Sequence, residues 1–155
     1  MSYVGEVNVF IRKFTFVITD VRSYFCLKLK QFVMGKLLTI EDDVLLRETL
    51  TEILEVYGHT VIQAGDGAEG VELFTKTTPD LIICDVNMPK LDGFQVLKKL
   101  KVLVGASKFP PFIFLSAKTE QKNIQYALEL GAVDFVAKPY SATELLKLID
   151  LRLNE

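Results

Sequence analysis

Residues Leu81 to Gly93 read LIICDVNMPKLDG, and this stretch decides the fold class. The run LIIC is apolar at every position, which is typical of a strand in a parallel sheet that helices cover on both faces. The run ends at Asp85, and Asn87 follows two residues later. In sheets of this kind, ligands bind beyond the carboxyl ends of the strands. The stretch therefore predicts a buried strand with a polar site at its end.

Short apolar runs alternate with helical patterns on both sides of this stretch. In the helical patterns, apolar residues recur every three or four positions, which is the period of an amphipathic helix. The predicted strands are Lys36–Ile40, Thr60–Ala64, Leu81–Cys84, Phe112–Leu115 and Val133–Ala137. A predicted helix follows each strand, and these helices begin near Leu46, Ala68, Gly93, Ile124 and Ser141. The alternation predicts the α/β class, with a doubly wound five-stranded parallel sheet.

Polar side chains follow four of the five predicted strands. In chain order they are Glu41, Asp42, Asp85, Ser116 and Lys138. Because the carboxyl ends of parallel strands lie at one edge of a sheet, we expect these side chains to meet there. Three converging carboxylates repel one another, and Mg²⁺, which prefers oxygen ligands, would offset that repulsion. The hydroxyl and the ammonium are then suited to bind the oxygens of a phosphoryl group carried on a carboxylate.

Four segments together resemble the receiver domain of two-component response regulators. They are IEDD at Ile40–Asp43, DVNMPKLDG at Asp85–Gly93, SA at Ser116–Ala117 and KP at Lys138–Pro139. The resemblance covers residues 34–155, with the segments in the order and spacing of the family. It implies a flavodoxin-like, CheY-like fold with strand order 2-1-3-4-5.

The resemblance implies a role for each acidic residue of the site. Asp85 matches the phosphoacceptor, the nucleophile that receives the phosphoryl group. Glu41 and Asp42 match the acidic pair, in which Asp42 is a direct Mg²⁺ ligand and Glu41 acts through water. Asp85 itself and the backbone carbonyl of Asn87 complete the Mg²⁺ ligands that the resemblance implies.

The resemblance also implies a conformational switch. Ser116 matches the hydroxyl that moves to the phosphoryl group, and Lys138 matches the lysine that pairs with a phosphoryl oxygen. Phe135 lies at the aromatic switch position, although it is also a strand residue that core packing alone would explain. The Lys138–Pro139 peptide bond is expected to be cis. Phosphorylation would change the shape of the face formed by residues 119–153.

The resemblance implies that a sensor histidine kinase or a histidine phosphotransfer protein donates the phosphoryl group. Because the chain ends after the last predicted helix, we expect a stand-alone receiver that controls a downstream protein partner. It would not be an enzyme, beyond assisting its own phosphorylation and dephosphorylation. Two alternatives stay open: a pseudo-receiver that binds proteins without phosphorylation, and an aspartyl-nucleophile phosphatase. Such phosphatases normally carry a second Asp two residues after the nucleophile, where this chain has Asn87.

Composition limits the kinds of partner and the cellular compartment that we expect. The formal net charge is -2 and acids and bases are mixed along the chain, so no basic face for nucleic acid is expected. The two cysteines, Cys26 and Cys84, lack the spacing of a disulfide framework or a metal site, which fits a reducing cytoplasm. No apolar run approaches the roughly 18 residues of a membrane span, so residues 34–155 are not expected to contact a membrane.

Residues 1–33 depart from the family pattern, because receivers usually begin just before the first strand and Met34 looks like such a beginning. We expect residues 1–33 to be an N-terminal extension and residues 34–155 to be the receiver domain. Two explanations of the extension stay open. It is either an upstream translated stretch without a function, or an appendage whose amphipathic helix contacts a membrane surface or a partner.

Several other polar residues are expected to have structural roles only. Asp43 is expected at a helix start, where a carboxylate interacts favourably with the helix dipole. Asp92 is expected in a turn from loop to helix, and Ser141 and Glu144 fit a capping box. His59 follows a predicted helix end and has no predicted partner, so we expect it in a solvated loop.

Overall fold

The computed structural model describes residues 33–105, 108–117 and 120–155 of the chain. The predicted extension over residues 1–33 lies outside the described residues, except for Val33. The strands are β1 (Lys36–Ile40), β2 (Thr60–Ala64), β3 (Leu81–Asp85), β4 (Phe112–Ser116) and β5 (Asp134–Ala137). The helices are α2 (Val44–Val56), α3 (Gly67–Thr77), α4 (Gly93–Val104), α5 (Gln121–Glu129) and α6 (Ala142–Leu153). Among these described helices, none has the length and apolar character needed to span a lipid bilayer.

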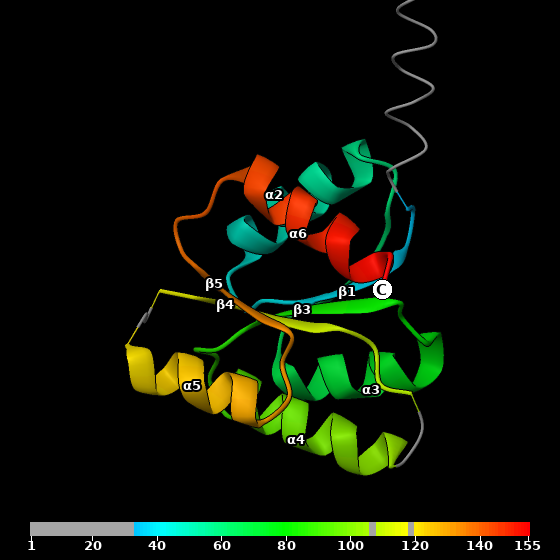
Figure 1. The fold of residues 1–155 in the computed structure, drawn as a ribbon. Coiled ribbons are helices and arrows are strands. Elements are labelled where there is room, and N and C mark those ends of the chain that lie inside the picture. The colour runs from blue at the N-terminus through cyan, green and yellow to red at the C-terminus, as the bar shows by residue number, and fades with distance from the viewer. Residues whose placement is uncertain (1–32, 106–107, 118–119) are drawn as a thin grey trace, which may run out of the picture. The chain divides into compact units, whose positions relative to one another are not determined.

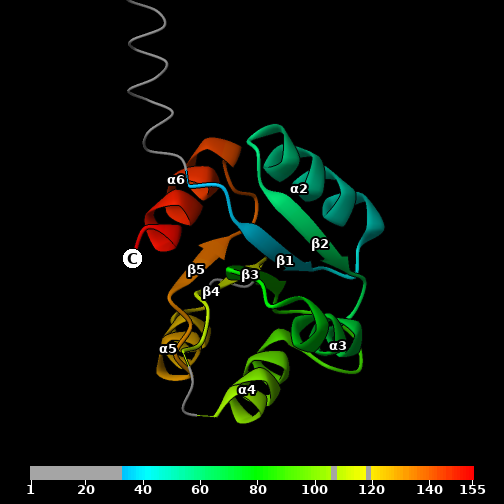
Figure 2. The ribbon, with the colours of Figure 1, turned by 90° about the vertical axis from the view of Figure 1, so that its right-hand side faces the viewer.

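The strands form one parallel sheet in the order β2-β1-β3-β4-β5, which confirms the predicted order. Helices α2 and α6 cover one face of this sheet, and α3, α4 and α5 cover the other face, as Figures 1 and 2 show. The central strands therefore lie between two helical layers. This position explains why β3 and β4 are buried along their whole length and why their sequences are almost entirely apolar.

Each face of the sheet carries its own part of the hydrophobic core. Successive strand residues point to opposite faces, so the neighbours Leu37 and Leu38 of β1 belong to different clusters. The cluster of Leu37 includes Leu50 of α2 and Leu145 of α6, whereas the cluster of Leu38 includes Leu97 of α4. This packing on both faces fixes the strands, and therefore the polar residues that follow their carboxyl ends.

Carboxylates cap two of the helices that follow site-bearing strands. The Asp43 side chain caps α2 by accepting a hydrogen bond from a backbone N–H of the first turn. Asp92 caps α4 in a capping box with Gln95. Both observations confirm the predicted helix starts. Ser141 stands at the N-cap of α6, but its side chain makes no capping hydrogen bond, so the predicted capping box with Glu144 is wrong.

His59 is buried, so the expected position in a solvated loop is wrong. Only 6% of the residue is exposed, and its Nδ1 accepts a hydrogen bond from the Gly35 N–H at 3.2 Å. β2 begins directly after His59 and pairs in parallel with β1, which brings the imidazole beside the start of β1. The two hydrogen-bonded residues are 24 positions apart in the chain, so no local sequence pattern indicates their contact.

Acidification is expected to destabilise the fold through His59. Burial lowers the pKa of His59 below its ordinary value of 6.5, and the charge of Asp150 only partly opposes this effect. The unfolded state therefore binds more protons than the folded state, and stability falls as the pH decreases through about 6.5 and below. A protonated imidazole also cannot accept the hydrogen bond of the Gly35 N–H.

Urea unfolding at about pH 7.5 and about pH 5.5 measures this effect, because the two values bracket the ordinary pKa of histidine. We expect the midpoint of the wild-type protein to fall between these values. In His59→Gln the side chain does not titrate, so the fall should be smaller. A variant whose midpoint falls as steeply as that of the wild type would show that His59 does not cause the acid sensitivity.

Candidate functional site

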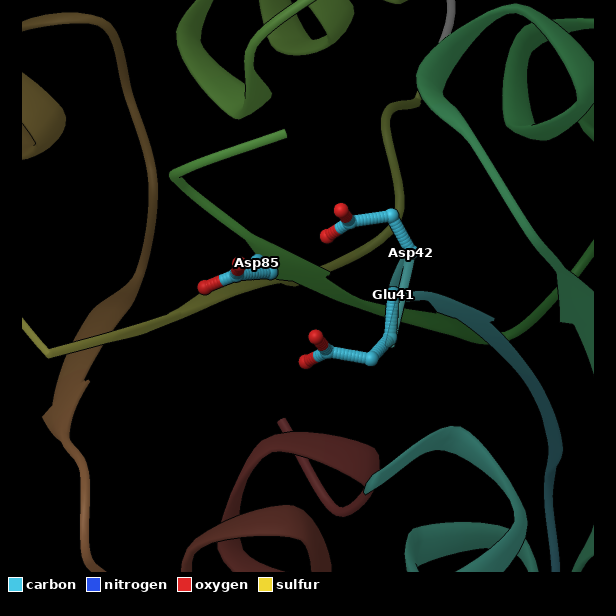
Figure 3. A group of neighbouring side chains, drawn as sticks. All are labelled: Glu41, Asp42 and Asp85. Carbon is cyan, nitrogen blue, oxygen red and sulfur yellow. The ribbon is translucent and has the colours of Figure 1, made fainter. Parts of the chain in front are cut away.

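Three predicted carboxylates meet at the carboxyl edge of the sheet. Glu41 and Asp42 follow β1, and Asp85 is the last residue of β3, which lies next to β1. One carboxylate oxygen of each residue lies within 4.8 Å of those of the other two. Figure 3 shows the three carboxyl groups turned to the same side of the strand ends. Glu41 and Asp85 are buried, whereas Asp42 is exposed.

The carboxylate cluster fits a divalent cation. Asp85 Oδ1 is buried and accepts no hydrogen bond from the described residues, so the Lys138 ammonium 3.2 Å away only partly compensates for the loss of hydration. Mg²⁺ prefers oxygen ligands and commonly binds through one or two carboxylates together with water and phosphate. The donor set of Glu41, Asp42 and Asp85 consists only of oxygens, so these residues suit Mg²⁺.

Lys138 extends from the end of β5 into the carboxylate cluster. Its Nζ lies 2.6 Å from Glu41 Oε2 and 3.2 Å from Asp85 Oδ1, where it forms an ion pair without hydrogen-bond geometry. The Lys138 N–H donates to the Ser116 carbonyl at 2.8 Å, and the Lys138–Pro139 peptide bond is cis. The structure thus brings Lys138 to the acids, as the sequence analysis expected.

Burial and charge act against each other on the titratable groups of the site. Burial raises the pKa of Glu41, and the charge of Asp85 adds to this effect, while the hydrogen bond from Lys138 opposes it. Burial alone would lower the pKa of Lys138, but its hydrogen bond to Glu41 and the nearby carboxylate charges outweigh burial and raise it. Lys138 therefore stays protonated at neutral pH and partly neutralises the cluster.

Ser116 and Asn87 stand beside the carboxylates. Ser116 ends β4 and is fully buried, and the Asn87 side-chain amide donates a hydrogen bond to Ser116 Oγ at 3.3 Å. Sequence reasoning placed Ser116 at the site but did not foresee this contact, because the two residues are 29 positions apart. The role of the Asn87 backbone carbonyl as a metal ligand stays a prediction.

Phe135, the expected aromatic switch, lies on β5 and is partly buried. Its ring centroid is 6.3 Å from that of Phe114, whose ring is 5.1 Å from the ring of Phe94 on α4. Phe135 thus contacts the core without being buried in it. Both explanations, a switch and a packing residue, agree with this position, and the switch role stays a prediction.

Sequence reasoning missed two further residues near the site. The Arg47 side chain donates a hydrogen bond to the Glu41 carbonyl at 2.7 Å. Tyr140 is partly buried, and burial raises its pKa, while the charge of Lys138 opposes the rise. Arg47 lies one helical turn after Asp43, and this position after the acidic pair was the only available signal. For Tyr140 the sequence held no comparable signal.

Comparison with known proteins identifies the family. The model of the family described as "Response regulator receiver domain" matches residues 37–150. The chain therefore belongs to the response regulator receiver domain family, as the resemblance implied.

Solved structures of receiver domains share the fold. The chemotaxis protein CheY4 of Vibrio cholerae is 31% identical, with a TM-score of 0.72, and the match covers 77% of this chain and 99% of CheY4. The N-terminal domain of an uncharacterized protein (WS1339) from Wolinella succinogenes is 38% identical, with a TM-score of 0.70, covering 79% of this chain and 95% of that domain.

Curated relatives include transcriptional regulators. The "Probable transcriptional regulator ycf27" of Porphyridium aerugineum is 37% identical over 110 residues, which cover 71% of this chain and 44% of the relative. The transcriptional regulatory protein PdtaR of Mycobacterium tuberculosis is 32% identical over 123 residues, which cover 79% of this chain and 58% of PdtaR. The chain thus spans about half the length of the curated relatives it matches.

Proposed function

We propose that residues 34–155 accept a phosphoryl group on Asp85 in a Mg²⁺-dependent reaction. The observation that carries this proposal is the buried Asp85 carboxylate, with one oxygen free of hydrogen bonds from the described residues, beside two further carboxylates and the Lys138 ammonium. By its family, the donor is the phosphohistidine of a sensor histidine kinase or a histidine phosphotransfer protein.

The residues divide the chemistry of phosphoryl transfer among them. An Asp85 oxygen attacks the phosphorus in line, and the bond between the phosphorus and the donor histidine nitrogen breaks. Lys138 Nζ, which lies 3.2 Å from Asp85 Oδ1, pairs with a phosphoryl oxygen. Glu41, Asp42 and Asp85 would hold Mg²⁺, which would neutralise negative charge on the transferred group. Catalysis is then mostly positioning, and water later hydrolyses the acyl phosphate.

Phosphorylation would next change the shape of the face formed by α5, β5 and α6. This face corresponds to the switch face expected at residues 119–153, of which the structure describes residues 120–153. Ser116 would leave its hydrogen bond with Asn87 and donate to a phosphoryl oxygen. Phe135 would move inward into the vacated space. New charge and new hydrogen bonds bias a two-state element in this manner.

The partners we propose are proteins. The phosphodonor approaches the carboxyl edge of the sheet, and a downstream protein target binds the switched face. Some curated relatives are named as transcriptional regulators, so a role of this receiver within a longer protein that regulates transcription agrees with the proposal. We also propose a cytoplasmic receiver that does not turn over small phosphoesters, since Asn87 stands where a phosphatase would carry its second Asp.

Incubation with acetyl phosphate and Mg²⁺ tests the proposal against its two alternatives. A receiver gains the mass of one phosphoryl group, and the gain disappears when EDTA removes the metal. A phosphatase instead releases free phosphate from added phosphoesters over many turnovers. A pseudo-receiver does neither, so an unchanged intact mass at saturating acetyl phosphate and Mg²⁺ would overturn the proposal.

A further inference from the structure

The Arg47 side chain reaches back from α2 to the main chain of the acidic pair. Its Nη1 donates to the Glu41 carbonyl oxygen at 2.7 Å, and the contact is partly buried. The Arg47 N–H in turn donates to the Asp43 carbonyl, so Arg47 lies in the first turn of the helix that Asp43 caps. One helical turn therefore both begins α2 and binds the backbone just before Asp42.

Both backbone groups of Glu41 are thereby fixed. Its N–H donates to the Ala64 carbonyl at the end of β2 at 3.1 Å, and its carbonyl accepts from Arg47. The Glu41 carbonyl and the Asp42 N–H belong to the same planar peptide unit. Arg47 therefore sets the orientation of the peptide that leads into Asp42.

Asp42 depends on this orientation more than its two neighbours in the cluster do. Glu41 and Asp85 are buried and contact Lys138, but Asp42 is exposed, and its side chain forms no hydrogen bond or ion pair with the described residues. Its carboxylate nevertheless lies within 4.8 Å of theirs. The backbone, and not a side-chain partner among the described residues, directs Asp42 toward the cluster.

The Arg47 guanidinium also lies close to Gly65, the residue that follows β2. The Gly65 N–H donates to Glu69 Oε2 at 2.6 Å. A Cβ built on Gly65 would lie 3.4 Å from both Arg47 Nη1 and Glu69 Oε2, so the guanidinium lies against the Gly65 backbone near a carboxylate. Arginine is a planar group with several donors in fixed directions, whereas lysine presents one compact ammonium.

We propose that Arg47 is a positioning residue of the metal site, which orients the Glu41–Asp42 peptide so that Asp42 faces Asp85. Arg47 contacts the Glu41 carbonyl and needs no contact with the metal or the phosphoryl group. This inference rests on the proposed Mg²⁺-dependent function. Removal of a group that orients a metal ligand typically weakens metal binding by about 10-fold to 100-fold.

The test uses the full chain with Arg47→Met, which keeps an unbranched apolar stem but removes the donors and the charge, and Arg47→Lys, which keeps the charge. Glu48→Gln, an exposed neighbour on α2, is the matched control. Mg²⁺ titrations followed by amide NMR shifts give the dissociation constant, and urea unfolding without Mg²⁺ gives the stability. We expect Arg47→Met to raise the dissociation constant about tenfold, Arg47→Lys to raise it less, and Glu48→Gln to leave it unchanged.

Phosphorylation by acetyl phosphate adds a second readout. In Arg47→Met the Mg²⁺ concentration for half-maximal rate should rise about tenfold, while the rate at saturating Mg²⁺ stays close to that of the wild type. Unchanged Mg²⁺ affinity in Arg47→Met, with or without lost stability, would overturn the role of Arg47 and leave the proposed function standing. A wild-type protein that binds Mg²⁺ but gains no phosphoryl group would overturn the proposed function, while the titrations would still decide the role of Arg47.

Discussion

Replacement of Asp85 by asparagine is expected to abolish phosphoryl uptake and to leave the protein folded. The asparagine amide has nearly the shape of the carboxylate but is not a nucleophile toward an acyl phosphate. Lys138 keeps its 2.6 Å ion pair with Glu41, so loss of the Asp85 charge does not leave the ammonium without a partner. After incubation with acetyl phosphate and Mg²⁺, intact mass should show no adduct on Asp85→Asn, against a clear adduct on the wild type.

Asp43→Asn is the matched control for this experiment. Asp43 lies next to the acidic pair, but its side chain caps α2, and asparagine caps helices about as well as aspartate does. The Asp43→Asn protein should therefore gain the phosphoryl group as the wild type does. An adduct on Asp85→Asn, or its loss from Asp43→Asn alone, would mean that the phosphoacceptor has been assigned to the wrong carboxylate.

Gly93→Ala is expected to have the largest effect on stability. The Gly93 N–H donates to the Val86 carbonyl at 3.0 Å, which holds the start of α4 against the end of β3. An added Cβ would overlap the backbone carbonyl oxygen of Asp85 and would lie 3.0 Å from the buried Phe114 ring. Because the overlapped oxygen belongs to the backbone, it cannot move away by a side-chain rotation. We therefore expect a loss of about 3 kcal/mol in the free energy of unfolding.

The same substitution should also impair phosphorylation, because relief of the overlap moves the main chain of the phosphoacceptor. Gly65→Ala is the comparison, since its Cβ would meet only side-chain ends at ordinary contact distance, and its stability should change by less than about 0.5 kcal/mol. Urea unfolding measures both variants. Equal midpoints for Gly93→Ala and Gly65→Ala would show that α4 can move away from β3 at little cost.

The sequence predicted the sheet and most of the site because their signals are local. The apolar run at Leu81–Cys84 marks a buried strand, and the polar residue that ends it, Asp85, lies where parallel sheets bind ligands. The same rule, together with the family resemblance, placed Glu41, Ser116 and Lys138 at one edge. The strand bounds then differ from the predicted ones by a residue at most.

Two of the features that sequence reasoning did not predict depend on contacts between segments that are distant in the chain. His59 accepts its hydrogen bond from Gly35, 24 positions away, and the Asn87 amide meets Ser116 only because β3 and β4 are neighbours. The Arg47 contact is local, since Arg47 lies six positions after Glu41, but its place after the acidic pair does not by itself show that the side chain returns to the Glu41 carbonyl. Such contacts follow from the fold and leave no periodic pattern in the chain.

Glu41 and Lys138 stand 97 positions apart in the chain, yet they form one ion pair. A ribosome delivers Glu41, Asp42 and Asp85 well before Lys138, and domains generally fold as units once enough of the chain has emerged. A nascent chain therefore contains the three carboxylates of the site before Lys138 has been synthesised. Under the proposed function, a nascent chain can therefore accept a phosphoryl group only after β5 and Lys138 have been synthesised and β5 has joined the sheet.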